Sequence, residues 1–136
     1  MSVPGDGAAA MAAAERDLLY VEDNPLNVLL MRALLEQRPH WRLRVAAGVD
    51  EAVAAALAAP PHLLLLDMHL PDGDGIALLA RLRTHAALRA VPAIAVSADA
   101  LESDIRAARA AGFDGYWTKP LHMGCVLAEL DTRLGA

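Results

Sequence analysis

Short apolar runs alternate with longer stretches of helical periodicity along most of this chain. Each run has the length of a β-strand, and the run at 62–66 holds four consecutive leucines, as expected of a strand buried on both faces. Between the runs, leucine and alanine recur three or four residues apart, which predicts amphipathic helices. The predicted strands are 17–21, 41–45, 62–66, 92–96 and 114–117, and the predicted helices are 25–38, 50–59, 75–85, 100–111 and 121–134.

Polar residues and prolines mark the ends of these elements. Asn24 and Pro25 have the residue types of a helix cap and a first helical position, and Pro39 ends that helix. Asp50 is predicted to cap the second helix, and the Pro-Asp-Gly-Asp-Gly sequence at 71–75 predicts a turn. Strands that alternate with helices predict an α/β fold. We therefore expect five βα units that form a doubly wound five-stranded parallel sheet with helices on both faces.

The size and composition of the chain suit one domain of 136 residues with a core of Leu, Val, Ile and Ala. Residues 1–15, rich in Gly, Pro and Ala, are expected to form a flexible leader, and 16–136 the folded domain. Trp117 is expected to pack in the core. Trp41 opens a strand of alternating pattern, so we expect it to be partly exposed.

Charge and hydropathy exclude two classes of partner. A net charge of −5 argues against a nucleic-acid-binding surface, which needs clustered Lys and Arg. No apolar run approaches the length of about 20 residues that a membrane span requires. The single cysteine, Cys125, lies among Leu and Val in a predicted helix, which predicts a small buried hydrophobe. A chain with one cysteine and no targeting signal is expected in a reducing cytoplasm.

Chemically active side chains stand at the carboxyl ends of four predicted strands. Glu22 and Asp23 follow the first strand, Asp67 follows the third, Ser97 the fourth and Lys119 the fifth. In an open parallel sheet these ends meet at one edge, where ligands bind. Carboxylates, a hydroxyl and a lysine gathered there suit a divalent metal and a phosphoryl group.

The individual residues support this interpretation to different degrees. Asp67 follows four leucines, where a charge without a partner would be costly. Pro120 directly after Lys119 constrains the loop and allows a cis peptide bond that would aim the ammonium over the sheet edge. Ser97 fits two roles equally well from the sequence. It can be a ligand of the phosphoryl group, or either Ser97 or Asp99 can cap the helix that follows.

Four segments together resemble the receiver domain of two-component response regulators. They are VEDNPLN (21–27), LLLLDMHLPDGDG (63–75), AVSADA (95–100) and AGFDGYWTKP (111–120). The intervals are 44 residues from Asp23 to Asp67, 30 from Asp67 to Ser97 and 22 from Ser97 to Lys119, which are typical of that family. The resemblance covers about 17–134 and implies the five-stranded flavodoxin-like receiver fold.

The resemblance implies a role for each acidic residue of the site. Asp67 is similar to the phosphoacceptor of the family. Glu22 and Asp23 resemble the acidic pair that holds Mg²⁺ together with Asp67 and the backbone carbonyl of His69. Mg²⁺ is therefore the expected cofactor.

It also implies roles for residues of the later loops. Ser97 resembles the switch hydroxyl that bonds the phosphoryl group, and Lys119 the lysine that contacts a phosphoryl oxygen. Tyr116 resembles the aromatic residue that turns inward when the hydroxyl moves. The side chains of His69 and Asp99 stand where related proteins tune the rate of dephosphorylation, although an exposed loop residue explains His69 equally well.

As a receiver, the chain would take a phosphoryl group from the phosphohistidine of a histidine kinase or a histidine phosphotransfer protein. It would then switch the face made by the helix at 100–111, the strand at 114–117 and the helix at 121–134. Beyond its own phosphorylation and dephosphorylation it would not be an enzyme. The sequence leaves open whether phosphorylation drives dimerisation through the last helix.

Two other functions compete with this one. A Mg²⁺-dependent phosphatase also uses an aspartate nucleophile on a doubly wound sheet, but such enzymes place a second Asp two residues later, where this chain has His69. A pseudo-receiver that binds partners without phosphorylation is disfavoured by the intact set of Asp23, Asp67, Ser97 and Lys119. No output domain follows 134, so we expect output through protein contacts, either from a stand-alone regulator or from a part of a hybrid sensor kinase.

Overall fold

A five-stranded parallel sheet with helices against both faces makes up the computed structural model, which describes residues 15–135. The predicted leader therefore lies outside the described residues, except for Glu15. The sheet strands are Arg16–Val21 (β1), Trp41–Ala46 (β2), Leu63–Asp67 (β3), Ala93–Ser97 (β6) and Gly115–Thr118 (β7). The helices are Pro25–Leu35 (α2), Val49–Ala58 (α3), Gly75–Arg83 (α4), Glu102–Ala110 (α5) and Met123–Leu134 (α6), with a short 3-10 turn at Ala86–Leu88 (η1).

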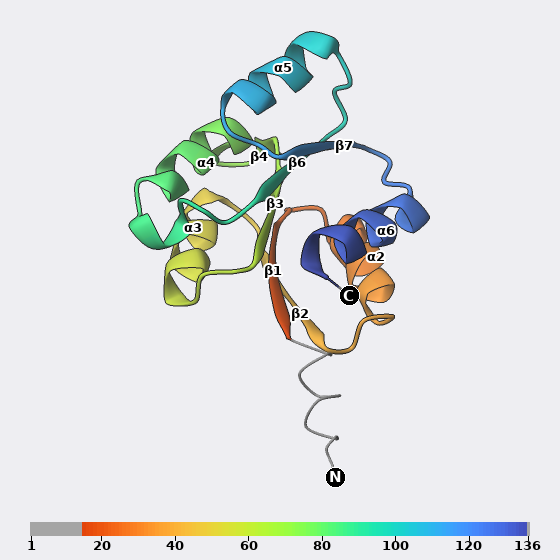
Figure 1. Ribbon diagram of the computed structural model, residues 1–136. Coiled ribbons are helices and arrows are strands. Elements are labelled where there is room, and N and C mark those ends of the chain that lie inside the picture. Colours follow the sequence, from red (N-terminus) through yellow and green to blue (C-terminus); the bar gives the residue numbers. More distant parts are fainter. Residues whose placement is uncertain (1–14, 136) are drawn as a thin grey trace.

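The order of the strands across the sheet is β2-β1-β3-β6-β7, and every pair is parallel. The chain therefore winds one way from β1 to β2 and the other way from β3 onwards, which is the doubly wound flavodoxin-like arrangement expected from the sequence. The winding direction reverses between β1 and β3, and in such folds ligands bind at the carboxyl end of that switch point. In Figure 1, α2 and α6 lie on one side of the sheet and α3 and α4 on the other.

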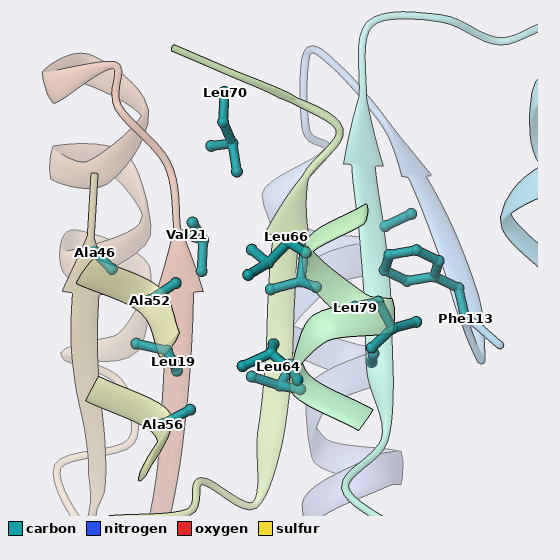
Figure 2. Close-up of a cluster of buried hydrophobic side chains, with 14 of the residues drawn as sticks. Leu19, Val21, Ala46, Ala52, Ala56, Leu64, Leu66, Leu70, Leu79 and Phe113 are labelled. Carbon is teal, nitrogen blue, oxygen red and sulfur yellow. The ribbon is translucent and has the colours of Figure 1, made fainter. Parts of the chain in front are cut away.

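Alternate residues of the strands supply two separate cores. Leu19 and Val21 of β1 and Leu64 and Leu66 of β3 face α3 and α4, as Figure 2 shows. Their strand neighbours face α2 and α6, because successive side chains of a strand point to opposite faces. This second cluster holds Leu18, Tyr20, Leu63, Leu65, Ile94 and Val96 from the strands, Met31, Leu34 and Leu35 from α2, and Val126, Leu130 and Leu134 from α6.

The predicted elements are all present, with small differences at their ends. Every strand of the sheet except β1 ends one residue later than expected, so Asp67 and Ser97 are the final residues of β3 and β6. Helix α2 ends at Leu35 rather than 38. The turn at 71–75 is the tip of a small antiparallel hairpin, in which His69–Leu70 (β4) pairs with Gly73–Asp74 (β5). No helix within 15–135 has the length and apolar character to cross a membrane.

The caps of the helices follow the prediction at Asn24 and differ from it at Asp50, and a further cap at Asp74 was not predicted. Asn24 accepts a hydrogen bond from Leu26 N at the start of α2. Asp74 accepts one from Ala77 N at the start of α4. The prediction that Asp50 caps α3 is wrong, because the helix begins at Val49 and Gly48 is its N-cap.

The free amide at the start of α3 has a partner from elsewhere in the chain. The carboxylate of Asp72 accepts from Val49 N at 2.9 Å. A loop 23 residues away thus supplies the cap, and no local pattern indicates it.

Two burial predictions are also wrong. Trp41 is buried, because its ring packs in the cluster under α2 and α6 and the Arg38 guanidinium lies 5.9 Å from the ring centroid. Cys125 is exposed, because the buried stripe of α6 runs through Val126 and Leu130. One residue of a helix turns by about 100°, which places Cys125 off that stripe. Trp117 is buried, as predicted.

Candidate functional site

The polar residues singled out from the sequence gather at the carboxyl edge of the sheet. Tyrosine and tryptophan aside, three polar side chains are buried within residues 15–135, and all belong to this edge: Glu22, Asp67 and Ser97, each at most 3% exposed. Glu22 follows β1, Asp67 ends β3 and Ser97 ends β6, so neighbouring parallel strands place them side by side. Asp23 is exposed at the rim of the same edge.

Lys119 lies between the two buried carboxylates. Its Nζ is 2.9 Å from Glu22 Oε1 and 2.9 Å from Asp67 Oδ2. Burial lowers the pKa of Lys119, but its hydrogen bonds to Asp67 and Glu22 outweigh burial, so the pKa is raised above its ordinary value. The ammonium therefore carries its charge throughout the neutral pH range.

The backbone around Lys119 holds it at this edge. Lys119 N donates to the carbonyl of Ser97 at 2.8 Å, which extends the pairing of β7 with β6 by one residue. The Lys119–Pro120 peptide bond is cis, as the sequence allowed. Gly75 provides a close approach on the other side of the site, because a Cβ there would lie 2.9 Å from the carbonyl oxygen of Asp67.

Glu22 has more partners than the sequence indicated. Its Oε1 accepts from Tyr20 OH at 3.2 Å and from Asn27 Nδ2 at 3.3 Å, and its Oε2 accepts from Asn24 N at 3.2 Å. Burial first, and then the charge of Glu22, raise the pKa of Tyr20 far above its ordinary value. Sequence reasoning missed Tyr20. The available signal was its position two residues before Glu22, on the same face of β1.

Three carboxylates can meet at one point of the site. Glu22, Asp23 and Asp67 each offer an oxygen atom, and these atoms lie within 4.8 Å of one another. They border an open pocket of about 500 Å³ that Asn24, Pro25, His69, Ala98 and Lys119 also line. Three negative charges face one ammonium there, and hard carboxylate oxygens are the ligands that Mg²⁺ prefers. The donor set thus fits a divalent magnesium ion.

Residues of two neighbouring loops form a second set of contacts beside this pocket. Asp67 Oδ1 accepts from His69 N at 2.9 Å, and His69 Nε2 is 2.7 Å from the carboxylate of Asp99. Ser97 Oγ accepts from Asp99 N at 3.1 Å. The alternative that Ser97 or Asp99 caps the next helix is wrong, because α5 begins at Glu102 and its N-cap is Leu101.

Tyr116 is joined to the same loop. Its hydroxyl donates to the carbonyl of Asp99 at 2.7 Å, and its ring is half-buried against the cluster under α3 and α4. A cavity of about 300 Å³ lies between this ring, Met68 of the loop after β3, and Ala107 of α5, and Ser97 also lines it. Asp99 therefore connects three predicted site residues, His69 through its side chain and Ser97 and Tyr116 through its backbone.

The comparisons with known proteins agree with this geometry. A family model described as the response regulator receiver domain matches residues 18–131. The polar-differentiation response regulator DivK of Brucella ovis is 32% identical over 120 residues, which are 88% of this chain and 97% of DivK.

Two solved structures are also similar. The receiver domain of the sensor histidine kinase PA1611 from Pseudomonas aeruginosa is 31% identical with a TM-score of 0.79, over 90% of this chain and 100% of that one, and holds a magnesium ion in its active-site cleft. The phosphorylated cyanobacterial phytochrome response regulator RcpA is 27% identical with a TM-score of 0.78, over 89% of this chain and 95% of that one. Sequence, fold and site agree, and the chain belongs to the response regulator receiver domain family.

Proposed function

We propose that this chain accepts a phosphoryl group on Asp67 from the phosphohistidine of a histidine kinase or histidine phosphotransfer protein, in a Mg²⁺-dependent reaction in the cytoplasm. The observation that carries the proposal is the charge arrangement at the sheet edge. Three carboxylate oxygens lie within 4.8 Å of one another, and the Lys119 ammonium contacts two of these side chains. Such a cluster favours a metal dication and a phosphoryl group together.

Asp67 is the nucleophile of the proposed transfer. One of its carboxylate oxygens attacks phosphorus, an O–P bond forms and the N–P bond of the donor breaks. The electron pair of that bond stays on the imidazole nitrogen of the donor, which takes up a proton. Asp67 suits the attack because His69 N and Lys119 Nζ each hold one of its oxygens, which fixes the orientation of the carboxylate.

Positioning and charge neutralisation together supply most of the catalysis in phosphoryl transfer. Lys119 Nζ already lies beside Asp67 and can contact an oxygen of the incoming phosphoryl group. Glu22, Asp23 and Asp67, with the backbone carbonyl of His69, would hold Mg²⁺. When bound, such an ion would supply two positive charges that offset the negative charge of the phosphoryl group. Hydrolysis of the acyl phosphate by water later restores Asp67, so the chain is a signalling acceptor and not an enzyme with a separate substrate.

The contacts of Asp99 suggest how phosphorylation changes the surface. A phosphoryl group adds about −1.5 to −2 charges and strong acceptor oxygens, to which the Ser97 hydroxyl can donate. Ser97 Oγ holds Asp99 N, and the Asp99 carbonyl holds Tyr116 OH, so movement of Ser97 displaces the partner of Tyr116. The ring of Tyr116 borders the adjacent cavity. The face formed by α5, β7 and α6 would then repack and favour partners that bind it.

The donor protein also needs a surface on which to dock. Leu26, Leu29 and Leu30 are 43–62% exposed on α2. This helix begins at Pro25, which lines the mouth of the pocket above Asp67. Because Asp67 is buried, a donor imidazole must enter through that mouth, and the rest of the donor must cover its surroundings. The apolar face of α2 is thus the docking surface that we propose for the phosphohistidine donor.

The first test is phosphorylation of the purified chain with Mg²⁺ and acetyl phosphate, followed by intact-mass measurement. We expect one added phosphoryl group on the wild type and none on Asp67→Asn or in the presence of EDTA. Continuous release of phosphate from unrelated monoesters would instead support a hydrolase. A folded wild type that binds Mg²⁺ but accepts no phosphoryl group, even from a phosphorylated histidine phosphotransfer protein, would support a pseudo-receiver.

The docking surface has a separate test. Leu29→Glu should slow transfer from a phosphorylated partner by at least about tenfold, since a buried apolar contact is replaced by a charge. The rate with acetyl phosphate should not change, because that donor needs no protein surface. Leu57→Glu is the matched control, since Leu57 is 44% exposed on α3 at the other face of the sheet. Equal losses in both variants would contradict this choice of surface.

A further inference from the structure

Tyr20 is a buried polar side chain that the proposed mechanism does not use. It lies in the middle of the apolar run of β1, and its ring packs in the cluster under α2 and α6 with no exposed surface. An aliphatic residue would fill that space without bringing a polar atom into the core. The phenol ring instead extends toward the carboxyl edge, where its hydroxyl meets Glu22.

The geometry of β1 explains this contact. Residues two apart on a strand point to the same face, so Tyr20 and Glu22 lie one behind the other on the α6 side of the sheet. Tyr20 OH donates to Glu22 Oε1 at 3.2 Å, the atom that also contacts Lys119 Nζ at 2.9 Å. A phenol keeps its proton at neutral pH and remains a donor. The hydroxyl therefore offers Glu22 a fixed point of attachment from inside the core.

The other partners of Glu22 come from less buried residues. The side chain of Asn27 and the backbone amide of Asn24 hold the carboxylate from the start of α2, and Lys119 holds it from the loop after β7. The terminal torsion of a glutamate is intrinsically soft, so its carboxylate plane is set by its partners. Among these partners, Tyr20 is the fully buried residue, and its ring is held on all sides by core packing.

We infer that Tyr20 is a positioning residue of this site: its hydroxyl fixes the carboxylate of Glu22, and through it the metal-binding oxygens and the ammonium of Lys119. The inference rests on the proposed function, because it assigns Tyr20 a part in the Mg²⁺ and phosphoryl site. Tyr20 is not one of the residues that would contact the metal ion or the phosphoryl group directly. Partners that orient metal-binding carboxylates commonly change metal affinity when they are removed.

The test is Tyr20→Phe, which removes one oxygen atom and keeps the ring. Mg²⁺ affinity is measured by NMR titration of the unphosphorylated protein, and we expect it to fall by about tenfold. In the metal-free protein the Asn24 amide should also shift and exchange faster, because it binds the other oxygen of Glu22. Leu19→Val is the matched control: it perturbs the core from the neighbouring residue of β1, on the opposite face, and should leave Mg²⁺ affinity unchanged.

A double-mutant cycle separates positioning from a general loss of structure. If Tyr20 acts through Glu22, Tyr20→Phe has no further effect on Mg²⁺ affinity in a Glu22→Ala background. Wild-type Mg²⁺ affinity in Tyr20→Phe, or equal losses in both backgrounds, would overturn the inference while leaving the proposed function intact. A wild type that binds no Mg²⁺ at all would instead count against the proposed function.

Discussion

Charged groups at the two ends of the sheet differ in their balance. At the carboxyl edge, the carboxylates of Glu22, Asp23 and Asp67 meet the single ammonium of Lys119, which leaves an excess of negative charge. At the amino edge, two carboxylates each pair with one arginine: Asp17 with Arg44 and Asp131 with Arg38. The first arrangement is incomplete without a cation, whereas the second is complete in itself.

The amino-edge pairs also satisfy neighbouring backbone groups. Arg44 Nε donates to Asp17 Oδ1 at 2.8 Å, and its guanidinium also binds the carbonyls of Ala55 and Ala59 at the end of α3. A cation at a helix C-terminus is favourable, and here one guanidinium joins β1, β2 and α3. Charge balance therefore distinguishes ion pairs that hold the fold together from an ion cluster that is kept ready for a ligand.

Lys119→Met tests this distinction where the expected effect is largest. Removing the ammonium should slow phosphorylation of Asp67 by acetyl phosphate by roughly 100-fold or more, since one donor to the developing phosphoryl charge is lost. The rate is followed by intact mass at saturating Mg²⁺. Arg38→Met, at the balanced end, should retain the wild-type rate. Similar rates in Lys119→Met and wild type would show that the carboxyl edge does not rely on this cation.

Arg44→Met tests the other end of the sheet. It leaves Asp17 half-buried without its partner and removes one donor each from the carbonyls of Ala55 and Ala59 at the end of α3, so we expect a loss of about 2 kcal/mol in the free energy of unfolding. Urea denaturation measures this change. Phosphorylation of the folded fraction should proceed at the wild-type rate. A slower phosphorylation at full folding would mean that the two ends are coupled.

Asp67→Asn should change the free energy of unfolding in the opposite direction to Arg44→Met. It removes one of three mutually repelling charges, and we expect the metal-free protein to gain about 1 kcal/mol in the free energy of unfolding. Saturating Mg²⁺ should stabilise the wild type through binding and leave the variant almost unchanged. Thermal unfolding with EDTA and with Mg²⁺ gives both values. A less stable variant in EDTA would show that the cluster is not repulsive.

The residues of the carboxyl edge could be predicted because strand ends are visible in the sequence. Glu22, Asp67, Ser97 and Lys119 each follow or end an apolar run, and a parallel sheet brings such positions together. The alternation of apolar runs and helical stretches also predicted the order of the elements and the presence of helices on both faces of the sheet. The information is local in each case: a run, its period and the residue at its end.

Contacts between distant segments could not be predicted in this way. Asp72 caps α3 from 23 residues away, and His69 meets Asp99 across 30 residues. A carboxylate in a turn looks the same in the sequence whether it faces water or another helix. The error at Asp50 has this cause, because its competitor for the cap lies on another loop.

The smallest expected effect concerns how the Arg38–Asp131 pair at the amino edge makes the stability of the protein depend on pH. The hydrogen bonds from Arg38 lower the pKa of Asp131 below its ordinary value. A carboxyl group whose pKa is lower in the folded state stabilises the protein above its unfolded pKa of about 4, and this contribution disappears as the pH falls through the folded value. The pair is partly exposed to solvent, which makes the contribution small.

Asp131→Asn should therefore be slightly less stable than wild type at pH 7, and the difference should shrink below about pH 4. Urea denaturation at a series of pH values measures it. A difference that persists in acid would mean that Asp131 acts through packing and not through its charge.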